Sequence, residues 1–154
     1  MEQTHTLDET REIGVRSLLL TIFFFTATAQ AQSIVAQGPW VKADYEVAGQ
    51  WKITRHGEQL YVELGDDFET KNGPDLHILL SPKSLTQLTD ANASQEALVV
   101  GLLKTTDDSV LFKKMKGAQR LAIPGEARLS DYRTILIHCV RFSHLWAGAE
   151  LNLK

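Results

Sequence analysis

Apolar and polar residues alternate with a period of two through residues 41–80, and this pattern is typical of strands that bury one face. Four short strands are predicted there, separated by turn residues. Their inward-facing side chains are Val41, Ala43, Tyr45 and Val47 in the first strand, Trp51 and Ile53 in the second, Leu60, Val62 and Leu64 in the third, and Leu76, Ile78 and Leu80 in the fourth.

The second half of the chain predicts further strands, and no amphipathic helix of a dozen residues is found. The strands are LVVGLLK, AQRLAIP, RTILIHCV and LWAGAELNL. Residues 81–97 are polar and alternate poorly, so they predict a long connection with a helical turn, and a second short helical piece is expected near residues 126–131. The pattern as a whole predicts an all-β fold, a small antiparallel β-sandwich or barrel.

Residues 1–31 have the features of a signal peptide. An apolar run follows Arg16 and closes on Ala29-Gln30-Ala31, the small-x-small pattern read by signal peptidase. The stretch before Arg16 is more acidic than basic, which leaves an over-extended start codon or an uncleaved anchor as alternatives. Cleavage after Ala31 would leave residues 32–154 as a single domain, exported to the periplasm or the extracellular space. No stable membrane span is expected after processing, because a span needs about 20 apolar residues.

The charge balance and the sequence motifs narrow the classes of function further. Without the four acidic and two basic residues of the leader, the chain's 19 acidic and 16 basic residues become 15 and 14. This balance gives no support to nucleic-acid binding, which requires a concentrated positive field. The chain has no nucleophile elbow, phosphate loop, dinucleotide fingerprint or zinc-ligand spacing. We therefore expect no resident metal and no independent catalytic activity, although enzyme status stays open.

Cys139 is the single cysteine, so it cannot form a disulfide within the chain. Strand parity puts Cys139 on one face with Ile135 and Ile137, and His138 on the other. Two interpretations stay open on these grounds: a small buried core residue, or a reactive thiol with His144 reaching back from beyond a bend.

Asp75 and His77 are two residues apart and are predicted to share a strand face. Asp75 could orient the imidazole or join it as a metal ligand, but two ligands are too few for a zinc site. Hydrogen bonding at the surface is therefore the favoured interpretation of this pair.

The order of several stretches resembles the DM-thirteen domain, also called the electron-transfer DM domain, over nearly all of residues 32–154. These stretches are VAGQWKI, LYVELGDDFETKNGPDLHILLS, VGLLK, GAQRLAIP and ILIHCVRFSHLWAGAEL. The specific part is the turn Gly73-Pro74-Asp75 together with the late Cys139. The resemblance implies a small exported β domain whose cysteine is oxidised reversibly or coordinates a redox centre, with the cofactor unknown. It also implies a redox protein partner in the cell envelope.

The last hairpin departs from the family pattern. His138 stands where the residue before the cysteine is often aromatic, Trp146 replaces the usual phenylalanine, and Ala147 takes the place of a glycine that comes one residue later as Gly148. These departures affect detail in the hairpin and leave the resemblance intact.

Three hypotheses follow. The first is an exported redox or electron-transfer accessory domain centred on Cys139, with His77, His144 and Trp146 as neighbours. The second is a non-enzymatic interaction module of the cell envelope whose cysteine is structural. The third, metal carriage through Asp75, His77 and His144, ranks below both.

Overall fold

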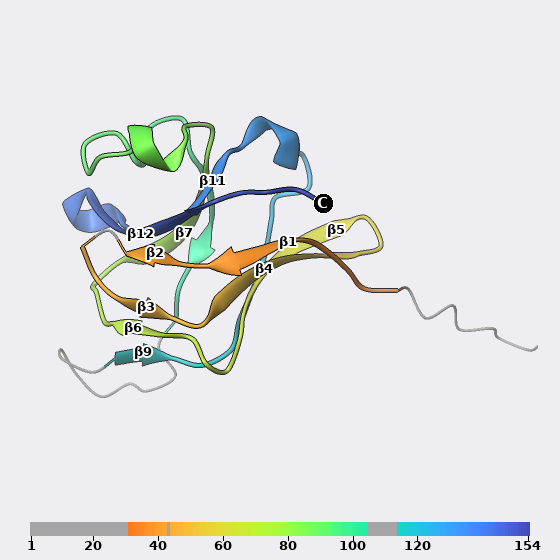
Figure 1. The fold of residues 1–154 in the computed structure, drawn as a ribbon, viewed down its shortest axis with the longest axis horizontal. Coiled ribbons are helices and arrows are strands. Elements are labelled where there is room, and N and C mark those ends of the chain that lie inside the picture. The colour runs from red at the N-terminus through yellow and green to blue at the C-terminus, as the bar shows by residue number, and fades with distance from the viewer. Residues whose placement is uncertain (1–30, 43, 105–113) are drawn as a thin grey trace, which may run out of the picture.

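The computed structural model describes residues 31–42, 44–104 and 114–154, and Figure 1 shows them as layered β-sheets. The predicted signal peptide lies outside the described residues, apart from Ala31. One sheet has four strands in the order β1 (Ser33–Pro39), β4 (Gln50–His56), β5 (Gln59–Leu64) and β10 (Gln119–Ala122). A second has five strands in the order β2 (Val41–Lys42), β12 (His144–Glu150), β11 (Thr134–Cys139), β7 (Leu76–Ser81) and β8 (Leu98–Leu102). A third, smaller sheet consists of β3 (Val47–Ala48), β6 (Glu69–Lys71) and β9 (Lys114–Lys116).

The core confirms the predicted all-β sandwich, since every paired strand is antiparallel and side chains from the two larger sheets pack in one cluster. The four-stranded sheet contributes Trp51, Ile53, Val62 and Leu64 to it. The five-stranded sheet contributes the alternate residues of β7 and β11, which are Leu76, Ile78, Leu80, Ile135, Ile137 and Cys139. These are the inward faces that the period-two pattern predicts.

The outer face of the five-stranded sheet is also buried along its central strands. Leu79, Leu136 and Leu145 lie there and pack with Leu88 and Ala93 of the connection between β7 and β8. This connection includes the 3-10 helix η1 (Leu85–Gln87), which confirms the helical turn predicted within residues 81–97. A second 3-10 helix, η2 (Leu129–Asp131), lies in the other region where a short helical piece is predicted.

The first predicted strand is wrong as a continuous element. Val41–Lys42 form β2 in the five-stranded sheet, and Val47–Ala48 form β3 in the three-stranded sheet. Val41, predicted inward, is 51 % exposed, and Ala43 lies outside the described residues. The chain changes sheet within this stretch, so the side chains do not share one face despite their alternation.

Three strands were not predicted from the sequence. β1 follows the predicted cleavage site directly and pairs with β4, with a β-bulge between Ile34 and Ala36. β6 and β9 have only three residues each, too few to show alternation. They pair with each other, and Lys71 at the end of β6 comes two residues before Gly73.

Within the described ranges, no helix is both long enough and apolar enough to cross a membrane.

Candidate functional site

Cys139 is the last residue of β11 and belongs to the main core cluster, with 1 % of its surface exposed. It lies opposite Leu76 of β7 and His144 of β12. His138 lies opposite His77 and Leu145, and Leu145 packs on the outer face. The predicted opposition of Cys139 and His138 is therefore confirmed, because residues directly paired across antiparallel strands share a face.

The chain turns sharply just after Cys139. The 3-10 helix η3 (Val140–Phe142) is followed by Ser143, whose φ of 50° is in the left-handed region, and β12 begins at His144. The Val140 amide donates to the backbone oxygen of Asp75 at 3.0 Å. This hydrogen bond joins the Gly73-Pro74-Asp75 turn to the end of β11, so the two motifs that carry the family resemblance meet in space.

Gly73 is required at this meeting point by close packing. A Cβ at residue 73 would lie 2.9 Å from Cδ2 of Leu76 and 3.1 Å from Cη2 of Trp146. Real Cβ atoms essentially never approach a heavy atom more closely than 3.0 Å. The glycine therefore lets the turn lie directly against the indole ring.

A hollow of about 310 Å³ opens beside Cys139. It is lined by aromatic residues, by the turn before β7 and by one lysine: Tyr45, Lys71, Asn72, Gly73, Pro74, Cys139, Phe142, His144 and Trp146. The structure thus brings Cys139 together with Gly73, Pro74, His144 and Trp146. A larger hollow of about 420 Å³, with Arg55, Ile123 and Lys154 in its lining, contains none of the sequence-predicted site residues.

Trp146 forms the aromatic wall of this pocket. Its ring stacks on Tyr45 with centroids 3.9 Å apart, and its Nε1 donates to Oγ1 of Thr70 at 3.0 Å. Thr70 is buried and donates in turn to the backbone oxygen of Glu46 at 3.0 Å. Nε1 of Trp146 and the hydroxyl of Thr70 therefore both have hydrogen-bond partners, as buried polar groups in folded proteins usually do.

Lys71 is the charged residue among the pocket residues that the sequence analysis missed. Its Nζ lies 4.9 Å from the centroid of the Tyr45 ring, within the range of a cation–π contact. Of the two histidines expected as neighbours of Cys139, His144 lines the pocket and His77 does not. The position of Lys71 two residues before Gly73 is a signal that could have identified it.

His77 and His138 lie on the face of the sheet away from the pocket. Nδ1 of His77 is 3.4 Å from both the backbone oxygen and Oδ1 of Asp75, the local pairing that the sequence predicts. His138 is fully buried, and neither of its ring nitrogens makes a hydrogen bond of standard geometry. Burial lowers the pKa of His138, and nearby Asp90 opposes this shift only in part.

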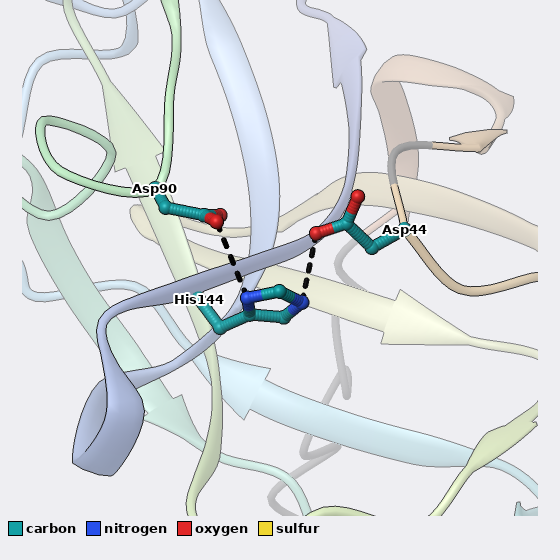
Figure 2. A group of neighbouring side chains, drawn as sticks. All are labelled: Asp44, Asp90 and His144. Atoms are coloured by element: carbon teal, nitrogen blue, oxygen red, sulfur yellow. Dashed lines mark ion pairs between the residues drawn. The ribbon is translucent and has the colours of Figure 1, made fainter.

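His144 lies between two carboxylates, as Figure 2 shows. Its Nε2 is 2.7 Å from Oδ2 of Asp44, and its Nδ1 is 3.3 Å from Oδ2 of Asp90. These three residues are the one group of potential metal ligands found among the described residues. Asp75 and His77, the partners considered for His144 from sequence, are not part of this group.

Comparison with known proteins gives one result. The family model "Electron transfer DM13" matches residues 40–151, which include the Gly73-Pro74-Asp75 turn, Cys139 and all residues named above as lining its pocket. Neither a curated protein nor a solved structure matches the chain. The match confirms the resemblance seen in the sequence, and the chain therefore belongs to the electron transfer DM13 family.

Proposed function

We propose that this protein is an exported electron-transfer accessory domain in which Cys139 is the redox group. In this proposal residues 1–31 direct export to the periplasm or the extracellular space, and a redox protein of the cell envelope is the partner. The family match supports a redox-related role. The position of the chain's single cysteine in the wall of an aromatic pocket is the observation that carries the assignment to Cys139.

The pocket matters because burial alone argues against reactivity. A cysteine enclosed by aliphatic side chains is inert, whereas a reactive one needs thiolate character and a route from solvent. Cys139 has Ile137 and Leu76 around it in the core, but the pocket reaches it on the side of Phe142 and His144. Lys71 and His144 are the side chains in this lining that can supply positive charge to a thiolate.

A single thiol can take part in a redox cycle through a sulfenic acid and a mixed disulfide. A peroxide transfers one oxygen to the Cys139 thiolate, which becomes a sulfenic acid, and the second peroxide oxygen leaves as water after protonation. A thiol of the partner then attacks the sulfenic sulfur, water leaves, and a mixed disulfide forms. A second partner thiol restores the Cys139 thiol and leaves the partner with a disulfide. Each disulfide of Cys139 is intermolecular, because no second cysteine exists in the chain.

The test is oxidation of the folded protein. Purified protein is treated with mild hydrogen peroxide and a dione that traps sulfenic acid, and intact mass is measured under native conditions and in denaturant. We expect one adduct on native protein and none on Cys139→Ala. A Cys139 that reacts only in denaturant would overturn the redox assignment.

Access through the pocket can be tested separately with two exposed residues of η3. Phe142 lines the pocket and is 68 % exposed, while Val140 is 41 % exposed and does not line it. Phe142→Ala should raise the rate of Cys139 modification in native protein several-fold, and Val140→Ala should leave that rate unchanged. Equal rates in the two variants would show that the thiol is reached by another path.

A second candidate function is a non-enzymatic interaction module of the cell envelope with a structural cysteine. The 1 % exposure of Cys139 within the core cluster favours it. It predicts that Cys139→Ala leaves partner binding intact and that oxidants do not modify the native protein. The peroxide experiment therefore distinguishes the two functions directly.

A further inference from the structure

Two carboxylates from distant parts of the chain converge on one imidazole at the end of the five-stranded sheet. Asp44 lies between β2 and β3, Asp90 lies in the connection between η1 and β8, and His144 begins β12. Figure 2 shows His144 between the two aspartates. One oxygen of each carboxylate and one ring nitrogen lie within 4.8 Å of one another.

Backbone hydrogen bonds hold both aspartates near the ring. The Leu145 amide donates to Oδ1 of Asp90 at 2.6 Å, which leaves Oδ2 directed to His144. The Tyr45 amide donates to the backbone oxygen of Trp146 at 3.4 Å, which holds the residue after Asp44 against β12. The arrangement therefore depends on the fold and is more than a chance meeting of mobile surface side chains.

The charge of this group suits a cation. Among the described residues, the ion pairs of Asp44 and Asp90 are both with His144. With a neutral imidazole the group carries two negative charges and one ring lone pair. Carboxylate oxygens together with an imidazole nitrogen are ligands for divalent first-row transition metals.

His138 supplies a second, independent observation. It is fully buried, neither of its ring nitrogens makes a hydrogen bond of standard geometry, and it lies opposite Leu145, whose amide donates to Oδ1 of Asp90. Most buried polar atoms in folded proteins have a hydrogen-bond partner, so an unpaired imidazole next to this group favours a polar ligand there. This corner of the protein thus has polar groups that the chain's own atoms leave unsatisfied.

We propose that Asp44, Asp90 and His144 bind a divalent transition-metal ion such as Zn²⁺ or Cu²⁺. The ion binds Nε2 of His144 and Oδ2 of Asp44 in place of the proton between them. The side chain of Asp90, whose Oδ2 faces Nδ1 in the structure, turns toward Nε2 to provide the third ligand. Metal–ligand bonds of about 2.0–2.2 Å place tetrahedral ligands about 3.3–3.6 Å apart, so the side chains must close around the ion. Asp44 and Asp90 are 47 % and 50 % exposed and have room to do so. Three protein ligands leave a coordination position open to water.

This site adjoins the Cys139 pocket but does not rest on the redox function. His144 lines the pocket and is the residue shared between the two sites. Cys139→Ala should therefore retain metal binding, and failure of the peroxide experiment would leave this proposal standing.

The test is calorimetric titration of Zn²⁺ into the full chain prepared without a histidine tag. We expect one ion per chain, and a loss of affinity of at least tenfold in each of Asp44→Asn, Asp90→Asn and His144→Gln. Asn at residue 90 keeps the oxygen that accepts the Leu145 amide, so that variant removes charge with little change in packing. The matched control is Asp75→Asn, which removes a carboxylate from the separate His77 pair and should bind like the wild type.

Electron paramagnetic resonance of the Cu²⁺-loaded wild type keeps the proposal testable if a variant fails to fold. A single imidazole nitrogen with oxygen ligands should be seen. A spectrum that shows two or more imidazoles or a sulfur ligand would overturn the proposed ligand set. Unchanged Zn²⁺ affinity in folded His144→Gln would overturn it as well. Loss of Zn²⁺ binding in Asp75→Asn would assign the ion to Asp75 and His77, and this result would also overturn the proposed ligand set.

Discussion

The contact between the Gly73-Pro74-Asp75 turn and Trp146 predicts that a single added methyl group at residue 73 destabilises the protein. In Gly73→Ala the new Cβ would lie 2.9 Å from Cδ2 and 3.0 Å from Cγ of Leu76, and 3.1 Å from Cη2 of Trp146. Leu76 is 1 % exposed and Trp146 is 5 % exposed, so neither side chain can move into solvent without opening the core.

The magnitude follows from overpacking. Inserting a methyl group into a well-packed core costs about 1–3 kcal/mol. An alanine also restricts the unfolded chain, which stabilises the folded state by about 0.4–1 kcal/mol where the backbone is compatible. Gly125→Ala isolates the steric part, because a Cβ at residue 125 meets nothing within 4 Å. Neither glycine has a left-handed φ, so the free energies of unfolding of the two variants should differ by about 1–3 kcal/mol.

Urea unfolding followed by far-ultraviolet circular dichroism measures this difference, provided that the m-value stays constant between the variants. Gly73→Ala should also change the rate at which a thiol reagent reaches Cys139 in native protein, since displacement of Trp146 reshapes the pocket. If the two variants unfold within about 0.5 kcal/mol of each other, which is the usual range for neutral surface changes, the turn does not depend on close packing against the indole.

Three further outcomes are expected. Burial lowers the pKa of His138 from 6.5, so the unfolded chain binds a proton that the folded one excludes, and stability should fall as pH drops below about 6.5. His138→Phe should reduce that fall in urea titrations at pH 7.5 and 5.5, and an unchanged pH dependence would contradict the assignment. Cys139→Ala should cost on the order of 1 kcal/mol in the free energy of unfolding, with the fold retained by circular dichroism. Intact-mass measurement of exported protein should give Gln32 as the first residue, whereas full-length chain in the membrane fraction would indicate an anchor.

Strand parity predicted most of the core because a half-buried strand must alternate. Trp51 and Ile53 in β4 and Ile135 and Ile137 in β11 are buried as expected, and Cys139 packs on the same face as the two isoleucines. The same rule failed at residues 41–47, where the chain leaves one sheet and joins another. Alternation reports the local pleat of the backbone and carries no information about which neighbour a short strand will pair with.

The residues of the Cys139 pocket that belong to the family motifs could be predicted from the sequence. Residues that only tertiary structure brings together could not. Gly73, Pro74 and Cys139 could be named from the sequence, and the structure brings them to one pocket. The convergence of Asp44 and Asp90 on His144 could not be predicted, because it depends on how two irregular segments lie across the start of β12.

The composition of the pocket depends on one irregularity in β12. The register between β11 and β12 shifts between Ile137 and His138, so that Ile137 pairs with Ala147 while His138 pairs with Leu145. Trp146 is the extra residue of this bulge, and both it and Ala147 pack in the main core. With strict alternation counted back from Ala147, Trp146 and His144 would both point away from Cys139. The bulge therefore turns both side chains to the face of the thiol and also sets His144 within reach of the two aspartates. Hence this single extra residue in the last hairpin, where the sequence departs from the family pattern, positions both candidate sites.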